Sequence, residues 1–376
     1  MDFILTDLQK SIRQTFSDFV ERKVIPVAAR LDEEKKFPRD LFRQAGDLGF
    51  FGMRYPESAG GTGADSVSYS LAVMELAKGS LSLAAACTMQ SLMATYFLYR
   101  FGDKEIKENF FFPALKGEKI GAICMTEPNA GSDLMAISSS AKVTENGFIL
   151  NGQKTWVTSG PVADFFTVLA RTDNNDQLSV FFVPRHLAGV QIGRNIEKMG
   201  VRASETCEVG FSDVALPENY LLGGIGEGTK CLREILAEIR IMTAALAIGV
   251  ATAAYEYAVE YAKTRVQFGK PIGKFQAIQI KIADMAVQLE TSKNYVLFAA
   301  SLSDKNLPRQ KEAMIAKLYA SEAANSICDE ASRVLASYGY AMDFPVQRYL
   351  RDARFTLIGG GTSEILKINI AKELGL

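Results

Sequence analysis

Histidine is almost absent from this chain: His186, in the loop-like stretch FVPRHLAGV, is the only one in 376 residues. Ser-His-Asp triads and metal centres that need several histidines are therefore not expected, and no metal ligand set is predicted. Five cysteines lie far apart without a Cys-x-x-Cys pair, which argues against a disulfide framework and favours a reduced, cytoplasmic protein. Any chemistry is expected to rely on a cofactor.

Excess charge of one sign is lacking as well. The chain has 42 Lys and Arg against 43 Asp and Glu, a formal net charge of -1, so no global basic field favours a nucleic-acid partner. No apolar run approaches the roughly 18 residues of a membrane span. The opening MDFILTDLQKSIRQ is typical of an amphipathic helix rather than a signal peptide. With 48% hydrophobic residues, the chain is long enough for two or three domains.

Helical periodicity marks both ends of the chain. Apolar residues recur at helical spacing through 8–32, 40–53 and 67–79, and the turn-rich YPESAGGTGADS separates the last two segments. After the glycine-rich GGIGEG, a helix of some thirty residues is expected from about 227, and two or three more long helices follow it. Its apolar stripe consists of Leu232, Ile235, Leu236, Ile239 and Met242.

The middle of the chain has a different period. Short runs rich in β-branched and aromatic residues begin near residue 119, with Asn-Gly at 146–147 and 151–152 and a polar break at DNNDQ. These are hairpin signals. We therefore expect an α+β protein with an N-terminal α-helical domain (1–118), a middle antiparallel β domain (119–226) and a C-terminal helical bundle (227–376).

Three segments carry features suited to a planar, phosphorylated ligand. In ICMTEPNAGSD (123–133) a strand end leads into a loop with short hydroxyls and exposed backbone amides. In QKTWVTSG (153–160) an aromatic wall and a hydroxyl stand two residues apart on a strand. RVQFGKPIGKFQ (265–276) follows the long helix. GGIGEG does not fit GxGxxG and lies in no βαβ unit, so a nicotinamide site is not expected.

These segments, in this order and together with FQAIQIKIADMA, PVQRYLRDARF and FTLIGGGTSEIL, resemble the acyl-CoA dehydrogenase family of flavoproteins over essentially the whole chain. The resemblance implies an N-terminal helical domain, a middle β domain and a C-terminal four-helix bundle. It also implies non-covalent FAD, a homotetramer or homodimer with flavin at a subunit interface, and electron-transfer flavoprotein as the electron partner.

The resemblance assigns candidate binding residues as well. FAD is expected to contact one subunit and to be held by residues at the 265–276 segment of its neighbour. A departure occurs where the family has Gln-x-x-Gly-Gly, because this chain reads Arg333-Val-Leu-Ala336-Ser337. The residues expected at FAD are Met125, Thr126, Ser132, Trp156, Thr158, Thr362 and Glu364 in one subunit, and Arg265, Phe268 and Gln276 in the other. Those expected at the thioester are Thr88, Gln90, Ser91, Ser132, Arg240, Gly360 and Gly361.

The catalytic carboxylate is the main departure. Family members remove the α-proton of a CoA thioester with a glutamate, which most of them carry at the position of Gly360 and another branch carries at the position of Ile239. Glu238 is one residue off, and one helical residue is roughly 100° of rotation, so it points elsewhere unless a π-bulge turns it inward. Glu238 and Arg240 are nevertheless the candidate catalytic residues. A positioned base supplies about 10² to 10⁴ in rate.

Three functions remain open on these grounds. The first is an FAD-dependent acyl-CoA dehydrogenase, or an enoyl-CoA reductase run in reverse, that acts on an unusual alicyclic or branched thioester. The second is a family member with changed chemistry, such as a desulfinase or a flavin monooxygenase. The third is a non-catalytic subunit that binds CoA thioesters or flavin. The sequence fixes neither the acyl group nor the direction of reaction.

Overall fold

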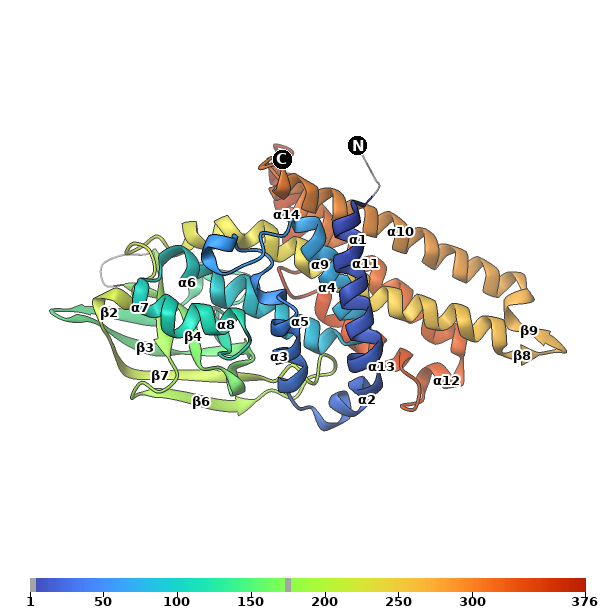
Figure 1. The fold of residues 1–376 in the computed structure, drawn as a ribbon, viewed down its shortest axis with the longest axis horizontal. Coiled ribbons are helices and arrows are strands. Elements are labelled where there is room, and N and C mark those ends of the chain that lie inside the picture. Colours follow the sequence, from blue (N-terminus) through green and yellow to red (C-terminus); the bar gives the residue numbers. More distant parts are fainter. Residues whose placement is uncertain (1–4, 173–176) are drawn as a thin grey trace.

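The computed structural model describes residues 5–172 and 177–376. Helices form both ends of the chain and a β-sheet forms the middle, as the sequence periodicity predicted (Figure 1). Of the polar break expected at DNNDQ, only Gln177 lies within the described residues.

The N-terminal domain is built from short helices, several of them joined by π-helical turns. Thr6 caps the first helix through a capping box with Gln9, which satisfies backbone amides that the helix leaves free. The helices are α1 (Asp7–Phe19), α2 (Ile25–Glu34), α3 (Arg39–Asp47), α4 (Ser66–Gly79), α5 (Leu81–Met89), α6 (Thr95–Phe101), α7 (Lys104–Ile106) and α8 (Phe112–Leu115), with π-helical turns at Val20–Val24, Gln90–Ala94 and Lys107–Phe111.

The middle domain is a seven-stranded sheet in the order β1-β4-β2-β3-β7-β6, with β5 paired to β4. The strands are β1 (Gly121–Cys124), β2 (Ser140–Thr144), β3 (Gly147–Thr158), β4 (Phe165–Thr172), β5 (Leu178–Pro184), β6 (Val190–Asn195) and β7 (Thr206–Leu216). The sheet has its own apolar core, which includes Phe148, Phe166 and Phe181.

Two details of the β prediction are wrong. The sheet is mixed rather than antiparallel, because β4 pairs in parallel with both β1 and β2. Turn residues report only local hairpins, so these longer-range pairs left no signal in the sequence. Asn146-Gly147 does end a two-residue hairpin loop, but Asn151-Gly152 lies inside β3 at a register shift, where Gly152 has φ +149 and packs against Ser139.

The C-terminal domain contains three long helices and shorter ones that close over them. Alanine and glycine let α9 pack closely on α4: a Cβ on Gly249 would lie 2.4 Å from the Met74 carbonyl oxygen. The elements are α9 (Gly228–Thr264), β8 (Val266–Gln267), β9 (Lys270–Pro271), α10 (Gln276–Asp304), α11 (Gln310–Leu335), α12 (Ser337–Tyr340), α13 (Val346–Thr356) and α14 (Ser363–Glu373). The expected long helix is confirmed, and no π-bulge interrupts it.

Two helical stretches within the described residues, Leu81–Phe101 and Gly228–Thr264, are long and apolar enough to cross a membrane. The prediction that no apolar segment reaches this length is therefore wrong. In each helix, however, the most apolar 18-residue segment is largely buried inside the protein, 89% of it in the first and 83% in the second. Because of this burial, we assign both helices to the core; core helices can meet the same length and hydropathy criteria.

Candidate active site

The triple glycine forms the loop between α13 and α14, and it lies against α9. Gly360 and Gly361 have φ values of +73 and +107, which side chains rarely adopt. A Cβ at Gly360 would come 2.9 Å from the Thr243 hydroxyl oxygen. That hydroxyl donates to the Ile239 carbonyl oxygen at 2.8 Å, one helical turn earlier. The two positions where the resemblance expects a base are therefore neighbours, and neither holds a carboxylate.

Lys317, on α11, forms hydrogen bonds to the backbone of the glycine loop. Its ammonium donates to the carbonyl oxygens of Gly361 at 2.6 Å and Leu357 at 3.2 Å, the two ends of the loop. The side chain is 0% exposed, and this burial lowers the pKa of the ammonium to about 8. Sequence reasoning missed Lys317, because a lysine in the middle of an amphipathic helix is usually a surface residue.

Arg240 lies beside Ile239 on α9 and is 7% exposed. No ion pair or hydrogen bond holds its guanidinium within residues 5–172 and 177–376, and its Nε is buried without a partner. Burial lowers the pKa of the group. Buried charges are normally paired, so this cation has the character of a binding group that awaits an anion.

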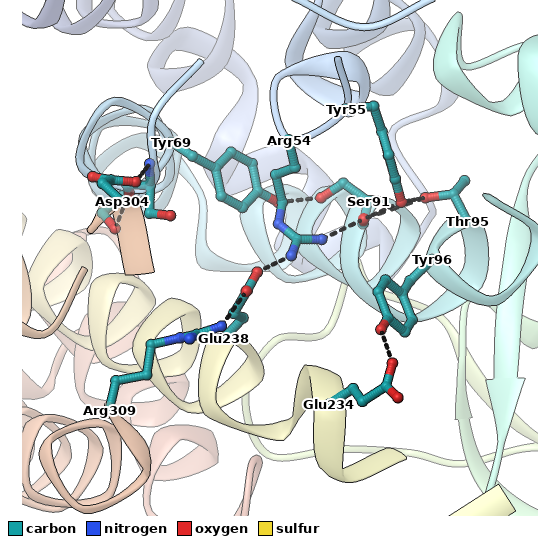
Figure 2. Close-up of polar contacts among 12 residues, drawn as sticks. Arg54, Tyr55, Tyr69, Ser91, Thr95, Tyr96, Glu234, Glu238, Asp304 and Arg309 are labelled. Carbon is teal, nitrogen blue, oxygen red and sulfur yellow. Dashed lines mark hydrogen bonds and ion pairs between the residues drawn. The ribbon is translucent and has the colours of Figure 1, made fainter. Parts of the chain in front are cut away.

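Glu238, the sequence-predicted alternative base, is engaged by two arginines. Figure 2 shows its carboxylate between Arg54, from the loop before α4, and Arg309, just before α11. The Arg309 contact is 3.0 Å, and Arg54 also donates to the Ser91 carbonyl oxygen at 3.3 Å. A carboxylate shared by two guanidiniums favours its ionised, acceptor-only form, and both oxygens are occupied. This geometry disfavours Glu238 as a proton acceptor.

The expected thioester residues of the N-terminal domain are buried, and their polar atoms are used within the protein. Thr88 donates to the carbonyl oxygens of Ala84 and Ala85, and the Ser91 hydroxyl meets that of Tyr69. The Gln90 amide bonds to the carbonyl oxygen of Lys119 at 2.7 Å and to the N–H of Gly121 at 2.8 Å. Gln90 therefore ties the helical domain to β1. Their role at a substrate stays a prediction.

The loop after β1 is fixed by a buried ion pair that sequence reasoning also missed. Lys154 on β3 lies 2.8 Å from Glu127, which also accepts from the N–H groups of Ser138 and Ser139. Burial acts to raise the pKa of Glu127, but these hydrogen bonds outweigh it and lower the value to about 2. The pair anchors the segment that carries Met125 and Thr126, both half-buried, and the exposed Ser132.

Trp156 and Thr158 lie at an irregular stretch of β3. Register shifts occur between Lys154 and Val157, and Trp156 has φ +58, so simple alternation does not describe this part of the strand. Trp156 is 57% exposed, while Thr158 is half-buried and pairs with Thr206 on β7. An exposed indole beside a hydroxyl is a surface on which a flat ring can stack.

Arg265, Phe268 and Gln276 lie around the β8–β9 hairpin, at the opposite end of the molecule from the sheet (Figure 1). Phe268 is 92% exposed, and Arg265 lies over the Tyr338 ring at 5.5 Å. The hairpin lies away from the sheet whose β3 carries Trp156 (Figure 1), and a contribution of these three residues to a neighbouring subunit stays a prediction.

The last expected cofactor contacts flank the start of α14. Thr362 caps this eleven-residue helix, accepting from the N–H of Ile365, and Glu364 is exposed in its first turn. Helix N-termini bind phosphate well, so the position suits a phosphorylated ligand. Arg333, where the sequence departs from the family pattern, is exposed and pairs with Asp329 at 2.7 Å.

The donor set fits a flavin nucleotide: an exposed indole, hydroxyls on an anchored loop and the N-terminus of α14, with a buried cation on α9. This combination of fold and donor groups is typical of a flavoprotein. The chain belongs to the acyl-CoA dehydrogenase family: the family's N-terminal, middle and C-terminal domain models match residues 6–118, 122–214 and 226–375. It is an FAD-dependent oxidoreductase that acts on CH–CH groups.

Among individual relatives, the chain is 57% identical over 375 residues to benzylmalonyl-CoA dehydrogenase of Aromatoleum aromaticum, covering 100% of both. The structure is similar to that of butyryl-CoA dehydrogenase from Megasphaera elsdenii, with a TM-score of 0.96, 37% identity and coverage of 100% of each chain. It is also similar to the FAD complex of PigA, with a TM-score of 0.96, 28% identity and coverage of 100% of each chain. The family prediction and the FAD prediction are confirmed.

Proposed function

We propose that the chain oxidises a 2-carboxyacyl-CoA thioester with an aromatic acyl group and releases the 2-carboxyl group as CO₂. The observation that carries this proposal is the pair of base positions on the glycine loop and on α9. They hold Gly360 and Ile239, and the nearest sequence candidate, Glu238, is bound by two arginines. A reaction that starts by removing an α-proton lacks a residue to accept that proton.

A carboxylate on the α-carbon makes a base unnecessary. When the bond between C2 and the carboxylate breaks, CO₂ leaves and the electron pair stays on C2, where the thioester carbonyl delocalises it as an enolate. The pair then forms the C2=C3 double bond as the hydrogen on C3 departs with its bonding electrons. The products are CO₂ and an α,β-unsaturated acyl-CoA, and no proton is removed from the substrate. FAD, when bound, supplies the acceptor for that hydride.

The relative of 57% identity supports the choice of substrate, since benzylmalonyl-CoA is an α-carboxy thioester with an aromatic ring. The likeness extends over the whole of both chains and therefore includes all three family domains. A benzylmalonyl-type CoA thioester, in which a CH₂ group separates the aromatic ring from C2, accordingly replaces the alicyclic or branched thioester considered from the sequence alone.

We place FAD across a subunit interface. Trp156, Thr158 and the anchored loop of Met125, Thr126 and Ser132 would hold the ring, and the α14 start with Thr362 and Glu364 would approach the phosphates. Arg265, Phe268 and Gln276 of a neighbouring copy would complete the site, because the hairpin is too distant to serve its own sheet (Figure 1). A homotetramer or homodimer, electron-transfer flavoprotein as electron partner and a cytoplasmic location stay predictions.

The test is anaerobic mixing of the FAD-loaded protein with matched thioesters. Benzylmalonyl-CoA is expected to bleach the flavin with release of one CO₂ per flavin reduced, and cinnamoyl-CoA should form. 3-Phenylpropionyl-CoA, which lacks only the carboxylate, is expected to react at least about 10²-fold more slowly, the contribution of a general base. Equal bleaching by both thioesters would refute the proposal and favour ordinary dehydrogenation with a base from elsewhere. Sulfite release or hydroxylated product would favour changed chemistry.

A further inference from the structure

Two buried cations, Lys317 and Arg240, lie near each other and have no carboxylate partner in the described chain. Within the described residues, Lys317 bonds to backbone carbonyls, and the Nε of Arg240 is buried without a hydrogen-bond partner. Neither of the two acids near Lys317 forms an ion pair with it: Glu322 accepts a hydrogen bond from Ser363 at 2.6 Å, and Glu364 is exposed to solvent. Glu238, on the other side of α9, is already balanced by its two arginines.

We propose that Arg240 is a specificity-determining residue that binds the 2-carboxylate of the acyl group. This inference rests on the function proposed above and names the group that recognises the substrate's extra charge. Arg240 lies near enough to Lys317 to lower the pKa of that ammonium, and Lys317 bonds to the Gly361 carbonyl oxygen, so the guanidinium lies in the neighbourhood of the glycine loop, where C2 of the thioester is expected. The phosphates of CoA are at the far end of the pantetheine arm, and those of FAD are proposed at the start of α14, so the acyl carboxylate is the anion expected nearest to C2.

The chemistry of a guanidinium suits this role. Its fork of N–H donors matches the two carboxylate oxygens, so it fixes how the carboxylate is turned relative to the thioester plane. The breaking bond must overlap the carbonyl π system for its electrons to be delocalised. Arginine also holds its protons more firmly than lysine does, so it binds the anion without protonating the enolate that follows. Neutral CO₂ then loses its attraction to the cation and can leave.

Three variants of the FAD-loaded protein test this assignment: Arg240→Met, Arg240→Lys and the control Arg233→Met, an exposed arginine on the same helix. Steady-state KM and kcat would be measured with benzylmalonyl-CoA, and the Kd of 3-phenylpropionyl-CoA from the change in flavin absorbance. Arg240→Met is expected to raise KM for benzylmalonyl-CoA about 10²-fold and to change the Kd of the uncharged analogue less than about 3-fold. Arg240→Lys should recover part of the KM and release some 3-phenylpropionyl-CoA. Arg233→Met should leave the ratio of the two affinities unchanged.

An equal loss of affinity for both thioesters in Arg240→Met would overturn the inference, because it would assign Arg240 to CoA or to the fold. An unchanged KM for benzylmalonyl-CoA would overturn it as well. If the wild type does not turn over benzylmalonyl-CoA, the proposed function fails, and the same flavin titration then gives the Kd of both thioesters directly. A preference for the carboxylated thioester that disappears in Arg240→Met would still support the binding role.

Discussion

Installing a glutamate at Gly360 should restore proton abstraction, but only if Thr243 is made smaller. The backbone at Gly360 has φ +73, and a side chain there costs about 1–2 kcal/mol. Its Cβ would also lie 2.9 Å from the Thr243 hydroxyl oxygen, which is closer than packed atoms approach. Replacing Thr243 by alanine leaves its own Cβ, at 3.5 Å, as the nearest atom of that residue, which is ordinary contact.

These numbers rank the variants. A positioned base supplies about 10² to 10⁴ in rate, so Gly360→Glu with Thr243→Ala should oxidise 3-phenylpropionyl-CoA at least about 10²-fold faster than the wild type. Gly360→Glu alone should gain about tenfold less, because overpacking against Thr243, which costs about 1–3 kcal/mol, displaces the loop, and one factor of ten corresponds to about 1.4 kcal/mol. Both should lose activity on benzylmalonyl-CoA, since the new carboxylate repels that of the substrate.

The assay is anaerobic stopped-flow bleaching of bound flavin, with FAD content measured first. Gly360→Ala with Thr243→Ala carries the same backbone strain without a carboxylate and should show no gain. If the double glutamate variant retains FAD and binds 3-phenylpropionyl-CoA yet reacts no faster than the wild type, the reasoning about the empty base position is refuted.

Glu238→Gln should change kcat on benzylmalonyl-CoA less than about threefold, while it lowers stability by about 2 kcal/mol, because Arg54 and Arg309 lose their shared partner. A kcat loss of 10² or more in a variant with unchanged melting would instead restore Glu238 as the base. Asp352→Asn tests a pH effect: burial raises the pKa of Asp352 from 3.8 to about 6, so folding favours the protonated form, and that contribution is present below about pH 4 and lost as the pH rises through 6. The variant's Tm relative to wild type should therefore rise between pH 4.5 and 7.5, by the equivalent of about 2 to 3 kcal/mol; a difference in Tm that does not vary with pH would contradict this.

Periodicity was sufficient to predict the order of the domains and the long helix, because burial of one face imposes the helical period on residues such as Leu232, Ile235 and Ile239. The parallel strand pairs and the role of Asn151-Gly152 were missed, since they depend on contacts between distant segments. Comparison of adjacent positions also predicted that Glu238 and Ile239 point different ways.

The buried lysines were the larger gap. Lys154 and Lys317 look like surface residues in the sequence, and only their environment makes one of them an anchor for the loop after β1 and the other a brace for the glycine loop. Neither partner is local: Glu127 is 27 residues from Lys154, and Gly361 is 44 residues from Lys317. Pattern reasoning cannot find such pairs, because a single sequence records no spatial neighbours.

Glu238, Ile239 and Arg240 follow one another on one turn of α9, yet their surroundings differ. Glu238 lies between two arginines, Ile239 belongs to the apolar core, and Arg240 is buried without an ion partner in the described chain. Because the helix backbone fixes the direction of each side chain, every position on this turn keeps its own surroundings whatever residue it carries. Chemistry can thus be reassigned within the family by exchanging single side chains while the backbone scaffold stays the same.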